Sequence, residues 1–374
     1  MAIEIRTVSS RKDLKIFARF GNKLYKGNRY YVPSMPMDDL NTFDRDKNGA
    51  FEFCEAEYYL AYKDGKVVGR VAAIINHKAN ESWNVKQVRF GWIDFIDDLE
   101  VSKALLDKVT EFGKSRGMTA VAGPLGFTDF DPEGMLVEGF DRVSTMALIY
   151  NYPYYPEHMK KHGYVKETGW LEYRITIPQE LPERHRRLAQ MVMERNKLRI
   201  VKKTRSQIKK EKYGHKLFKL INETYCVLYG YSLLSEKQID QYVDVYLGLL
   251  DLRMVSFIEN ENGDLVAAGV SMPSLADALQ KCNGELFPFG WWYLLKTMFL
   301  KKPETLDLLL IGVLPEYQNK GVNTLIFVDL FQKMGFKYAE TNAHLETNIK
   351  VQQMWDPFEK EQHKKRWVFA KEIE

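Results

Sequence analysis

The sequence is poor in cysteine and does not cluster its histidines. Its 374 residues include three cysteines, which form no C-x-x-C pair, and seven histidines scattered along the chain. A small and odd number of cysteines predicts neither a disulfide framework nor a zinc site. We therefore expect no metal, and a reducing compartment such as the cytoplasm.

Long apolar runs and a strong charge imbalance are also absent. A membrane-spanning helix needs about 18 or more consecutive apolar residues, and the sequence has no such run. The first residues, MAIEIRTVSSRKDL, lack the apolar core of a signal peptide. The formal net charge of +4 points to no particular partner, and we expect no nucleic acid. These absences predict a cytoplasmic protein.

The remaining composition describes a folded protein of two domains. Hydrophobic residues make up 45% and charged residues 28% of the chain, which supplies enough apolar side chains for a sizeable core. A length of roughly 150 residues per domain gives two domains. Prolines interrupt the pattern at Pro178 and Pro182. The sequence therefore predicts domains at 1–178 and 183–374.

The two halves repeat one order of predicted elements. In each half, two strands joined by a glycine-containing turn precede a third strand and a helix. The repeat is one of architecture and not of sequence. The first half has strands predicted at 58–62, 67–75 and 88–96 and a helix at 101–116, and the second half has strands at 253–258, 265–272 and 306–313 and a helix from residue 324.

The segment Leu310–Asn323 carries the strongest functional signal. A mostly apolar run from Leu306 to Leu314 enters a Pro-Glu-Tyr turn, a polar Gln-Asn-Lys-Gly loop follows, and a helical pattern starts at Thr324. A loop between a strand and a helix N-terminus directs unpaired backbone N–H groups to one place, with the positive end of the helix dipole behind them. The segment predicts a seat for a diphosphate, and Lys320 adds a positive charge.

This segment resembles the acyl-CoA-binding motif of the GNAT superfamily of N-acetyltransferases, V-x-P-x-x-[QR]-x-x-G-x-[GA]. Val313, Pro315, Gln318 and Gly321 match in order, whereas Asn323 replaces the last glycine or alanine. The resemblance implies acetyl-CoA or a longer acyl-CoA as co-substrate. The residues that it places around this co-substrate are Ile311, Val313, Gln318, Asn319, Lys320, Gly321, Val322 and Asn323.

A second motif follows in the C-terminal part of the chain. GNAT proteins often carry N-x-x-[AS]-x-x-[LM]-[YF] there, and this sequence has Asn348, Val351 and Met354 in register but Trp355 at the aromatic position. The resemblance implies that Asn348 steadies the pantetheine arm and places Trp355, like Asn348, among the residues that bind the co-substrate. The usual tyrosine protonates the departing sulfur, which the indole N–H of Trp355 cannot do. That step is dispensable, because a thiol of pKa about 8.5 leaves tolerably as a thiolate.

Five further stretches, spread over most of the chain, carry a closer resemblance, and they are 123–127, 134–141, 150–155, 283–288 and 312–317. They resemble a bacterial family of tandem GNAT-like proteins that includes ceramide-synthase-like enzymes, which acylate a long-chain amine. The resemblance implies an α/β (α+β) fold of two tandem GNAT-like domains, each a mixed, mostly antiparallel sheet with helices on both faces.

The first half has an acidic segment in place of the phosphate loop. Its carboxylates, which belong to Asp97, Asp98 and Glu100, would repel a diphosphate. That half is expected to be degenerate.

The acceptor amine has to lose a proton before it attacks a thioester, and a carboxylate or a histidine is the expected base. The candidates are Glu340, His344 and Glu346, whose even spacing predicts that they share one face of a strand. Glu346 is the first choice, because it matches a recurrent glutamate in the resembling family, and His344 has the unperturbed pKa better suited to a base. Backbone N–H groups around Ile311 and Val313 are implied to hold the thioester carbonyl oxygen.

Residues 287–302 form an aromatic and apolar stretch that ends in lysines. Trp and Tyr beside Lys suit a bilayer interface or the mouth of an apolar tunnel. A buried helix and loop between strands would have the same composition. One expectation from the first interpretation is that this stretch brings a cytoplasmic protein into peripheral contact with the inner membrane face.

Several functions remain open from the sequence. The first is an acyl-CoA N-acyltransferase with a long-chain amine as acceptor, and the second is a small-molecule or peptide N-acetyltransferase. The third is a CoA-binding or partner-binding protein without catalysis, which Trp355 and Asn323 permit. Transfer from aminoacyl-tRNA is disfavoured, because it has no need for the diphosphate loop.

Overall fold

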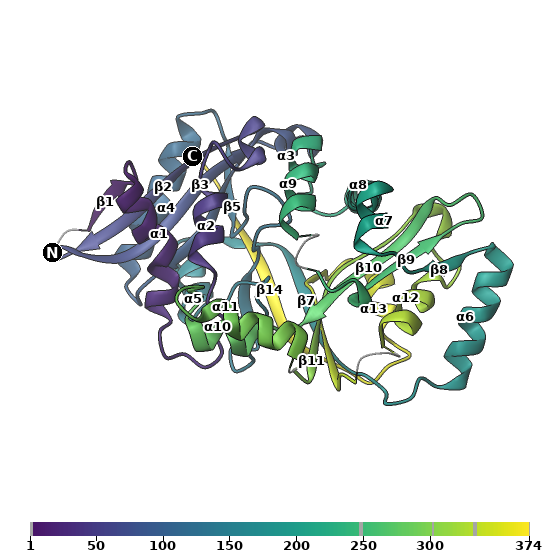
Figure 1. Ribbon diagram of the computed structural model, residues 1–374. Helices are drawn as coiled ribbons and strands as arrows, with labels where there is room; N and C mark the ends of the chain where they lie inside the picture. Colours follow the sequence, from purple (N-terminus) through teal and green to yellow (C-terminus); the bar gives the residue numbers. More distant parts are fainter. Residues whose placement is uncertain (1–2, 247–249, 301–302, 332–334, 374) are drawn as a thin grey trace.

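The computed structural model describes residues 3–246, 250–300, 303–331 and 335–373 (Figure 1). Its strands are β1 (Glu4–Thr7), β2 (Cys54–Lys63), β3 (Lys66–Asn76), β4 (Gln87–Phe95), β5 (Ala120–Gly123), β6 (Met135–Glu138), β7 (Val165–Thr176), β8 (Arg199–Val201), β9 (Val255–Glu259), β10 (Leu265–Pro273), β11 (Thr305–Val313), β12 (Tyr338–Thr341), β13 (His344–Leu345) and β14 (Lys360–Glu372). They form a 14-stranded sheet in the order β1-β2-β3-β4-β5-β14-β7-β12-β11-β10-β9-β8, with β13 beside β7 and β6 beside β14. Neighbours are antiparallel except for the pairs β4–β5 and β11–β12.

The helices connect these strands, and several begin at side-chain caps. Ser10 accepts a hydrogen bond from the Asp13 N–H at the start of α1, and Thr204 forms a capping box with Gln207 at the start of α7. The helices are α1 (Arg11–Leu24), α2 (Pro36–Thr42), α3 (His77–Ser82), α4 (Leu99–Lys114), α5 (Tyr154–Lys161), α6 (Glu183–Asn196), α7 (Arg205–Lys210), α8 (Tyr213–Tyr225), α9 (Glu236–Tyr246), α10 (Ala276–Cys282), α11 (Gly290–Leu295), α12 (Val322–Phe331) and α13 (Ile349–Gln353). The chain also forms short 3-10 helices at η1 (Gly49–Glu52), η2 (Leu252–Met254) and η4 (Pro315–Tyr317), and a π-helix at η3 (Lys296–Leu300).

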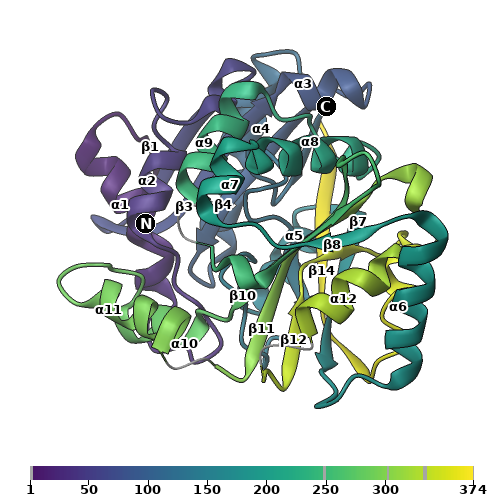
Figure 2. The ribbon, with the colours of Figure 1, turned by 45° about the vertical axis from the view of Figure 1, so that its right-hand side comes forward.

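Helices cover both faces of the sheet in each half, because successive residues of a strand point to opposite faces. On β3, Ala73 belongs to the hydrophobic cluster under α4, and its neighbour Ala72 belongs to the cluster under α1. On β10, Ala267 faces α12 and α6, and Ala268 faces α8. Figure 2 shows α6 and α12 together on one side of the C-terminal half. Each half therefore has two apolar layers around its part of the sheet.

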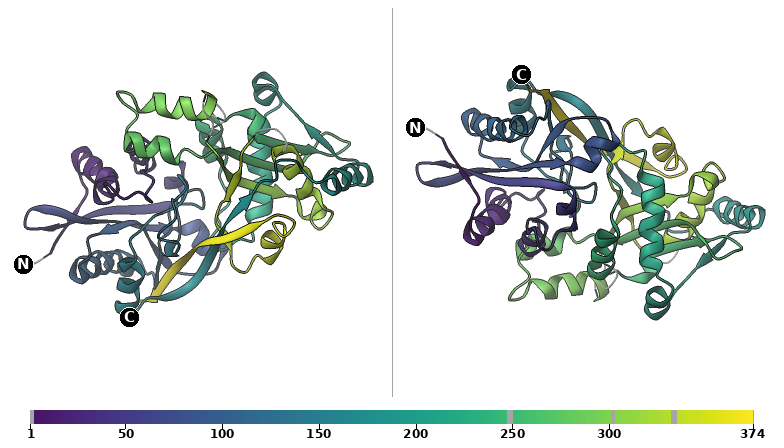
Figure 3. Two further views of the ribbon diagram at one scale, coloured as in Figure 1. Left: turned by 90° about the horizontal axis from the view of Figure 1, so that it is seen from below. Right: turned by 90° about the horizontal axis from the view of Figure 1, so that it is seen from above.

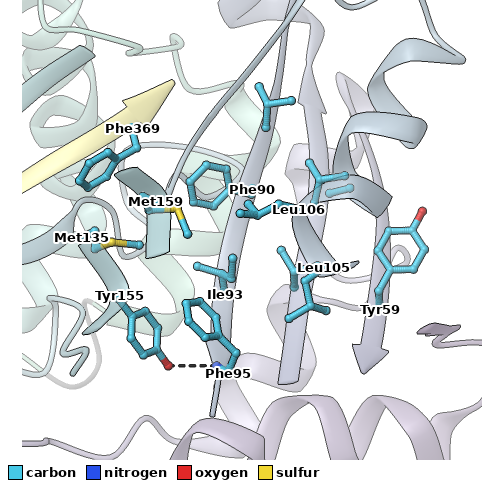
Figure 4. Close-up of a cluster of buried hydrophobic side chains, with 14 of the residues drawn as sticks. Tyr59, Phe90, Ile93, Phe95, Leu105, Leu106, Met135, Tyr155, Met159 and Phe369 are labelled. Carbon is cyan, nitrogen blue, oxygen red and sulfur yellow. Dashed lines mark hydrogen bonds between the residues drawn. The ribbon is translucent and has the colours of Figure 1, made fainter. Parts of the chain in front are cut away.

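The two halves exchange one strand each at the centre of the sheet. β14 pairs with β5 over Phe369–Glu372 and with β7 over Lys360–Ala370, and β7 pairs in turn with β12. Phe369, near the end of the chain, packs in the N-terminal core with Phe90 and Met135 (Figure 4). Each half is thus completed by a strand from the other half.

Buried charges fasten the exchanged strands to each other. Glu172 on β7 is fully buried and accepts hydrogen bonds from Arg366 Nε at 2.5 Å and from Lys364 Nζ at 3.3 Å, both on β14. Arg366 also donates to the carbonyl oxygens of Gly134 and Ile149. Burial alone would raise the pKa of Glu172, but the charges of Arg366 and Lys364 hold this pKa below its ordinary value.

The predicted fold class is confirmed, since two similar arrangements of strands with helices on both faces follow one another along the chain. The strands predicted at 67–75, 265–272 and 306–313 correspond to β3, β10 and β11. The division into 1–178 and 183–374 stays a prediction about the linear sequence, because β7 and β14 each lie among strands of the other half.

Replacing Glu172 with Gln should lower the free energy of unfolding by roughly 3–5 kcal/mol at neutral pH, because Arg366 and Lys364 would stay buried without a counter-charge. The folded-state pKa of Glu172 is lowered. Its contribution to stability is therefore fully present above the unfolded-state pKa and is lost as the pH falls through the folded-state pKa. Urea unfolding at neutral and acid pH measures both effects.

The matched control is Glu157→Gln on α5, where the carboxylate is exposed and pairs with Lys160. It should change the stability by less than about 0.5 kcal/mol. Equal stability of the two variants would show that the buried pairs do not hold the exchanged strands.

Candidate active site

The opening of the candidate site lies where β11 and β12 separate. These parallel strands are partners from Thr305 to Leu308, whereas β11 continues to Val313 as a partner of β10. The register of β10 and β11 shifts at Val270, as in a β-bulge. Among the described residues, no strand lies beside the other edge of β11 from Leu309 onward, and side chains bind part of this edge instead, among them Asn342, which donates to the Leu309 carbonyl oxygen at 3.1 Å.

A polar loop leads from the end of β11 to the N-terminus of α12. Asn319 and Gly321 have positive φ values of 60° and 77°, which are typical of loops that turn backbone N–H groups toward an anion. The N–H groups of Asn319, Lys320 and Gly321 donate to no other described residue. The side-chain amide of Gln318 donates to the carbonyl oxygen of Val313 at 3.1 Å and ties the loop to the strand. These free donors fit a diphosphate.

The residues of the second motif have structural partners. The Asn348 side chain caps α13 by accepting a hydrogen bond from the Val351 N–H. Trp355 is only 1% exposed and packs against Phe327 of α12, with 4.7 Å between ring centroids. Asn348 therefore stabilises the start of α13, and Trp355 packs the residues after α13 against α12. The contact of both side chains with the pantetheine arm stays a prediction.

The expectation that Glu340, His344 and Glu346 share one face of a strand is wrong. β12 ends at Thr341, and pairing with β7 resumes only at β13. Arg174 lies opposite Glu340, whereas Leu171, three residues away on β7, lies opposite His344. Residues three apart on a strand point to opposite faces, so Glu340 and His344 are separated by the sheet.

Both glutamates have basic side chains beside them, and for Glu340 these include Lys364, whose Nζ lies 3.7 Å from Oε2. Oε2 of Glu340 lies 2.7 Å from Nε2 of His363, and the Glu340 side chain is largely buried. Glu346 forms an ion pair with Lys166 of β7. Their roles as bases stay predictions, and neither carboxylate is unpaired.

His344 is enclosed by aromatic rings. Its ring lies 6.1 Å from that of Trp355 and 6.3 Å from that of Tyr173, measured between centroids. Burial lowers the pKa of His344 to about 4. The imidazole is therefore neutral at pH 7 and is a weak acceptor for the proton of an ammonium group.

Asp307 on β11 is a buried carboxylate that was not among the candidates selected from the sequence. Its neighbours Leu306 and Leu308 face α12, so Asp307 points to the opposite face of the sheet. It is 2% exposed, and neither carboxylate oxygen has a hydrogen-bond partner of normal geometry among the described residues. Burial and the nearby Glu340 carboxylate raise the pKa of Asp307 to about 7. One sign of this site is present in the sequence, because Asp307 is a single charged residue within a run of leucines.

Tyr225, at the end of α8, binds the backbone of β11 at the edge that no strand covers. Its hydroxyl accepts a hydrogen bond from the Ile311 N–H at 3.3 Å and donates to the Ile311 carbonyl oxygen at 3.1 Å. Burial raises the pKa of Tyr225 to about 12, so the hydroxyl stays protonated at neutral pH. Of the N–H groups around Ile311 and Val313 that the resemblance assigns to the thioester oxygen, that of Ile311 is thus already engaged. No sequence motif pointed to Tyr225, because it comes from a helix far from β11 in the chain.

The corresponding opening in the N-terminal half is filled. β4 pairs with β5 over Gln87–Arg89 and runs on to Phe95. There the Tyr155 hydroxyl accepts from the Phe95 N–H at 3.0 Å (Figure 4), and Tyr154 donates to the Phe95 carbonyl oxygen at 2.6 Å. The Asp98 side chain caps the N-terminus of α4. A filled opening and a capped helix support the prediction that this half does not hold CoA by the usual loop.

Potential metal ligands are not grouped. Within the part of the chain that the structure describes, no set of three or more His, Cys, Asp or Glu side chains is placed to hold a metal ion. The three cysteines are unpaired. The candidate site consists of the polar loop, the open edge of β11, Tyr225 and Asp307.

Replacing Gly321 with Glu should weaken acyl-CoA binding roughly tenfold or more, because a carboxylate would face the diphosphate. A side chain at this position also has a strained positive φ, and its Cβ would meet Val192 Cγ2 at 3.1 Å. Isothermal titration calorimetry with acetyl-CoA and palmitoyl-CoA measures the change. The control is Gly65→Glu, which has a similar φ of 73° in the turn between β2 and β3. Unchanged binding by the Gly321 variant would remove the loop as the seat of CoA.

No protein-family model matches the chain. The chain is similar to protein YghO of Escherichia coli (strain K12), with 26% identity over 385 residues that cover 99% of this chain and 95% of the relative. It is also similar to the bacterial ceramide synthase of Caulobacter vibrioides (strain NA1000 / CB15N), with 22% identity over 355 residues that cover 92% of this chain and 91% of the relative.

Solved structures show the same arrangement over the whole chain. A tandem GNAT protein from the clavulanic acid biosynthesis pathway has a TM-score of 0.56 and 11% identity, over 100% of this chain and 99% of that chain. A GCN5-related N-acetyltransferase from Sphaerobacter thermophilus has a TM-score of 0.52 and 11% identity, over 99% of this chain and 96% of that chain. These likenesses confirm the resemblance drawn from the sequence, and by its fold the chain is a tandem GNAT-like protein.

Proposed function

We propose that this protein is an acyl-CoA-dependent N-acyltransferase, which moves an acyl group from a CoA thioester to a primary amine by direct attack. The observation that carries the proposal is the continuity of the site. The loop with free N–H donors follows directly from the open edge of β11. A diphosphate on this loop would lead the pantetheine arm to the opening beside Tyr225 and Asp307.

In the proposed reaction the amine nitrogen forms a bond to the thioester carbonyl carbon, and the C–S bond breaks. The Ile311 N–H, or the Tyr225 hydroxyl in its place, donates a hydrogen bond to the carbonyl oxygen as negative charge develops there. CoA leaves as a thiolate, which is tolerable for a thiol of pKa about 8.5. The second proton of the attacking nitrogen passes to water, and water in turn protonates the thiolate. Trp355 is buried and supplies no proton.

We propose Asp307, rather than Glu346, as the base that takes the proton of the amine. A primary amine with a pKa near 10 is mostly charged at pH 7, and a base works best when its pKa lies near the working pH. The pKa of Asp307 is about 7, and the residue lies next to the point where β11 and β12 separate. Glu346 is engaged with Lys166 and remains the alternative.

The acceptor that we favour is a long-chain amine. Met272, the β10 partner of Asp307, belongs to an apolar cluster that also contains Met35, Met146 and Met298. Methionine side chains are flexible and adapt to apolar ligands of different shape. The name of the relative from Caulobacter vibrioides, bacterial ceramide synthase, supports a lipid amine as well.

The activity test combines two acyl donors with three kinds of amine. Acetyl-CoA or palmitoyl-CoA is incubated with the protein and a short amine, a peptide or a sphingoid base, and thiol release and product mass are followed. An N-acyl product from the sphingoid base is the expected result. Products from short amines or peptides alone would make the protein an N-acetyltransferase of small substrates. CoA binding without any product would favour a binding protein.

Replacing Asp307 with Asn should lower kcat/KM about 10²–10⁴-fold, because the amine would lack its base. In the unsubstituted protein kcat/KM should rise with pH as Asp307 ionises near pH 7, and the variant should lose this rise. CoA affinity, measured by calorimetry, should stay unchanged.

Glu346→Gln is the comparison variant and should keep most of its activity and its pH profile. The reverse pattern, in which Glu346→Gln is inactive and Asp307→Asn is active, would return the role of base to Glu346.

A further inference from the structure

The segment between β10 and β11 carries an exposed aromatic patch on α11, η3 and the loop before them. Phe287, Phe289 and Leu300 are exposed to 74%, 70% and 69%. Contiguous exposed apolar surface of this kind usually marks a contact site for a protein or a membrane. The residues of the aromatic patch are Phe287, Phe289, Trp291, Trp292, Tyr293, Leu295, Phe299 and Leu300.

The base of the aromatic patch is fixed to the N-terminal half. The side-chain amide of Gln280 on α10 donates to the carbonyl oxygens of Arg29 and Tyr31, both at 2.9 Å. Arg19 on α1 pairs with Glu285 at 2.8 Å. Figure 3 shows α10 and α11, in green, at the periphery of the molecule from two opposite directions. The aromatic side chains are therefore presented outward by an anchored platform.

The aromatic patch is associated with positive charge and not with negative charge. From Leu286 to Pro303 the sequence contains three lysines and neither Asp nor Glu. Lys296 is exposed between the aromatic residues of α11 and those of η3, and Lys301 and Lys302 lie outside the described residues. Trp and Tyr beside Lys are the combination found at the headgroup level of bilayers.

We propose that the aromatic patch docks the protein on an anionic lipid surface. The aromatic rings would lie at the boundary of headgroups and acyl chains, with Lys296 beside the lipid phosphates. A second copy of the chain is a poorer occupant. A symmetric pairing would bring the lysines of two copies together without a carboxylate in the segment to pair with them. None of the helices within the described residues is both long and apolar enough to cross a bilayer.

The aromatic patch and the proposed base are linked through one apolar cluster. Met298 of η3 turns inward and joins the cluster that contains Met272, and Met272 is the strand partner of Asp307. A docked protein would thus have its acceptor side toward the bilayer. This link rests on the proposed function, whereas the docking itself does not.

The test is co-sedimentation of the full-length protein with lipid vesicles. Vesicles of phosphatidylcholine are compared with vesicles that also contain phosphatidylglycerol, at low and high salt. Binding to the anionic vesicles that weakens with salt is expected. Trp291→Ser combined with Trp292→Ser should lower the binding constant roughly tenfold or more, and Lys296→Gln should lower it about fivefold on anionic vesicles.

The control combines Val165→Ser and Val227→Ser, which remove side chains exposed to 66% and 76% outside the aromatic patch and should bind as the unsubstituted protein does. Absence of vesicle binding, or binding that the tryptophan substitutions leave unchanged, would overturn the proposal. Light scattering is run in parallel, and a dimer that depends on Trp291 and Trp292 would assign the aromatic patch to a second copy. The vesicle assay reads no catalysis, so its outcome is independent of whether acyl transfer is found.

Discussion

The exchange of β7 and β14 at the centre of the sheet is the constraint on which the rest of the structure depends. Glu172 on β7 holds Arg366 and Lys364 on β14 in a buried network. A buried ion pair adds little stability over an apolar contact of the same shape, but it fixes register, because any slip leaves a charge unpaired. The strands that meet at the candidate site, β12 and β11, extend the sheet outward from β7. Their position is therefore set by this exchange.

The two halves have similar architecture, and they differ in the residues that occupy the opening between their two parallel strands. In both, two parallel strands separate after a few pairs, and tyrosine hydroxyls bind the backbone of the freed edge. In the N-terminal half Tyr155 and its neighbours are buried within an aromatic cluster, and a carboxylate caps the following helix. In the C-terminal half a single residue, Tyr225, bonds Ile311, and the following helix begins at a loop with free N–H groups. The N-terminal half is therefore suited to a structural role, and the C-terminal half is suited to binding a ligand.

The face of the sheet opposite α12 brings together groups that lie far apart in sequence. Asp307 from β11, Glu340 from β12 and Met272 from β10 are strand partners, and the methionine cluster around Met272 includes residues from the N-terminal half. A carboxylate buried beside another carboxylate keeps its proton to higher pH. The fold thereby creates a group that titrates near neutrality next to an apolar wall.

The sequence by itself determined the strand, loop and helix of the C-terminal motif, because local turn chemistry and periodicity depend on neighbouring residues. It also determined the repeated order of elements, and the fold class followed from the resemblance of its motifs to those of GNAT proteins. It did not determine which faces Glu340 and His344 occupy, because a one-residue irregularity between β12 and β13 reverses the alternation. Tertiary structure alone decided that β14 would complete the N-terminal sheet, that Tyr225 would reach Ile311 and that Asp307 would be buried. Those outcomes depend on contacts between segments distant in the chain, which no local pattern encodes.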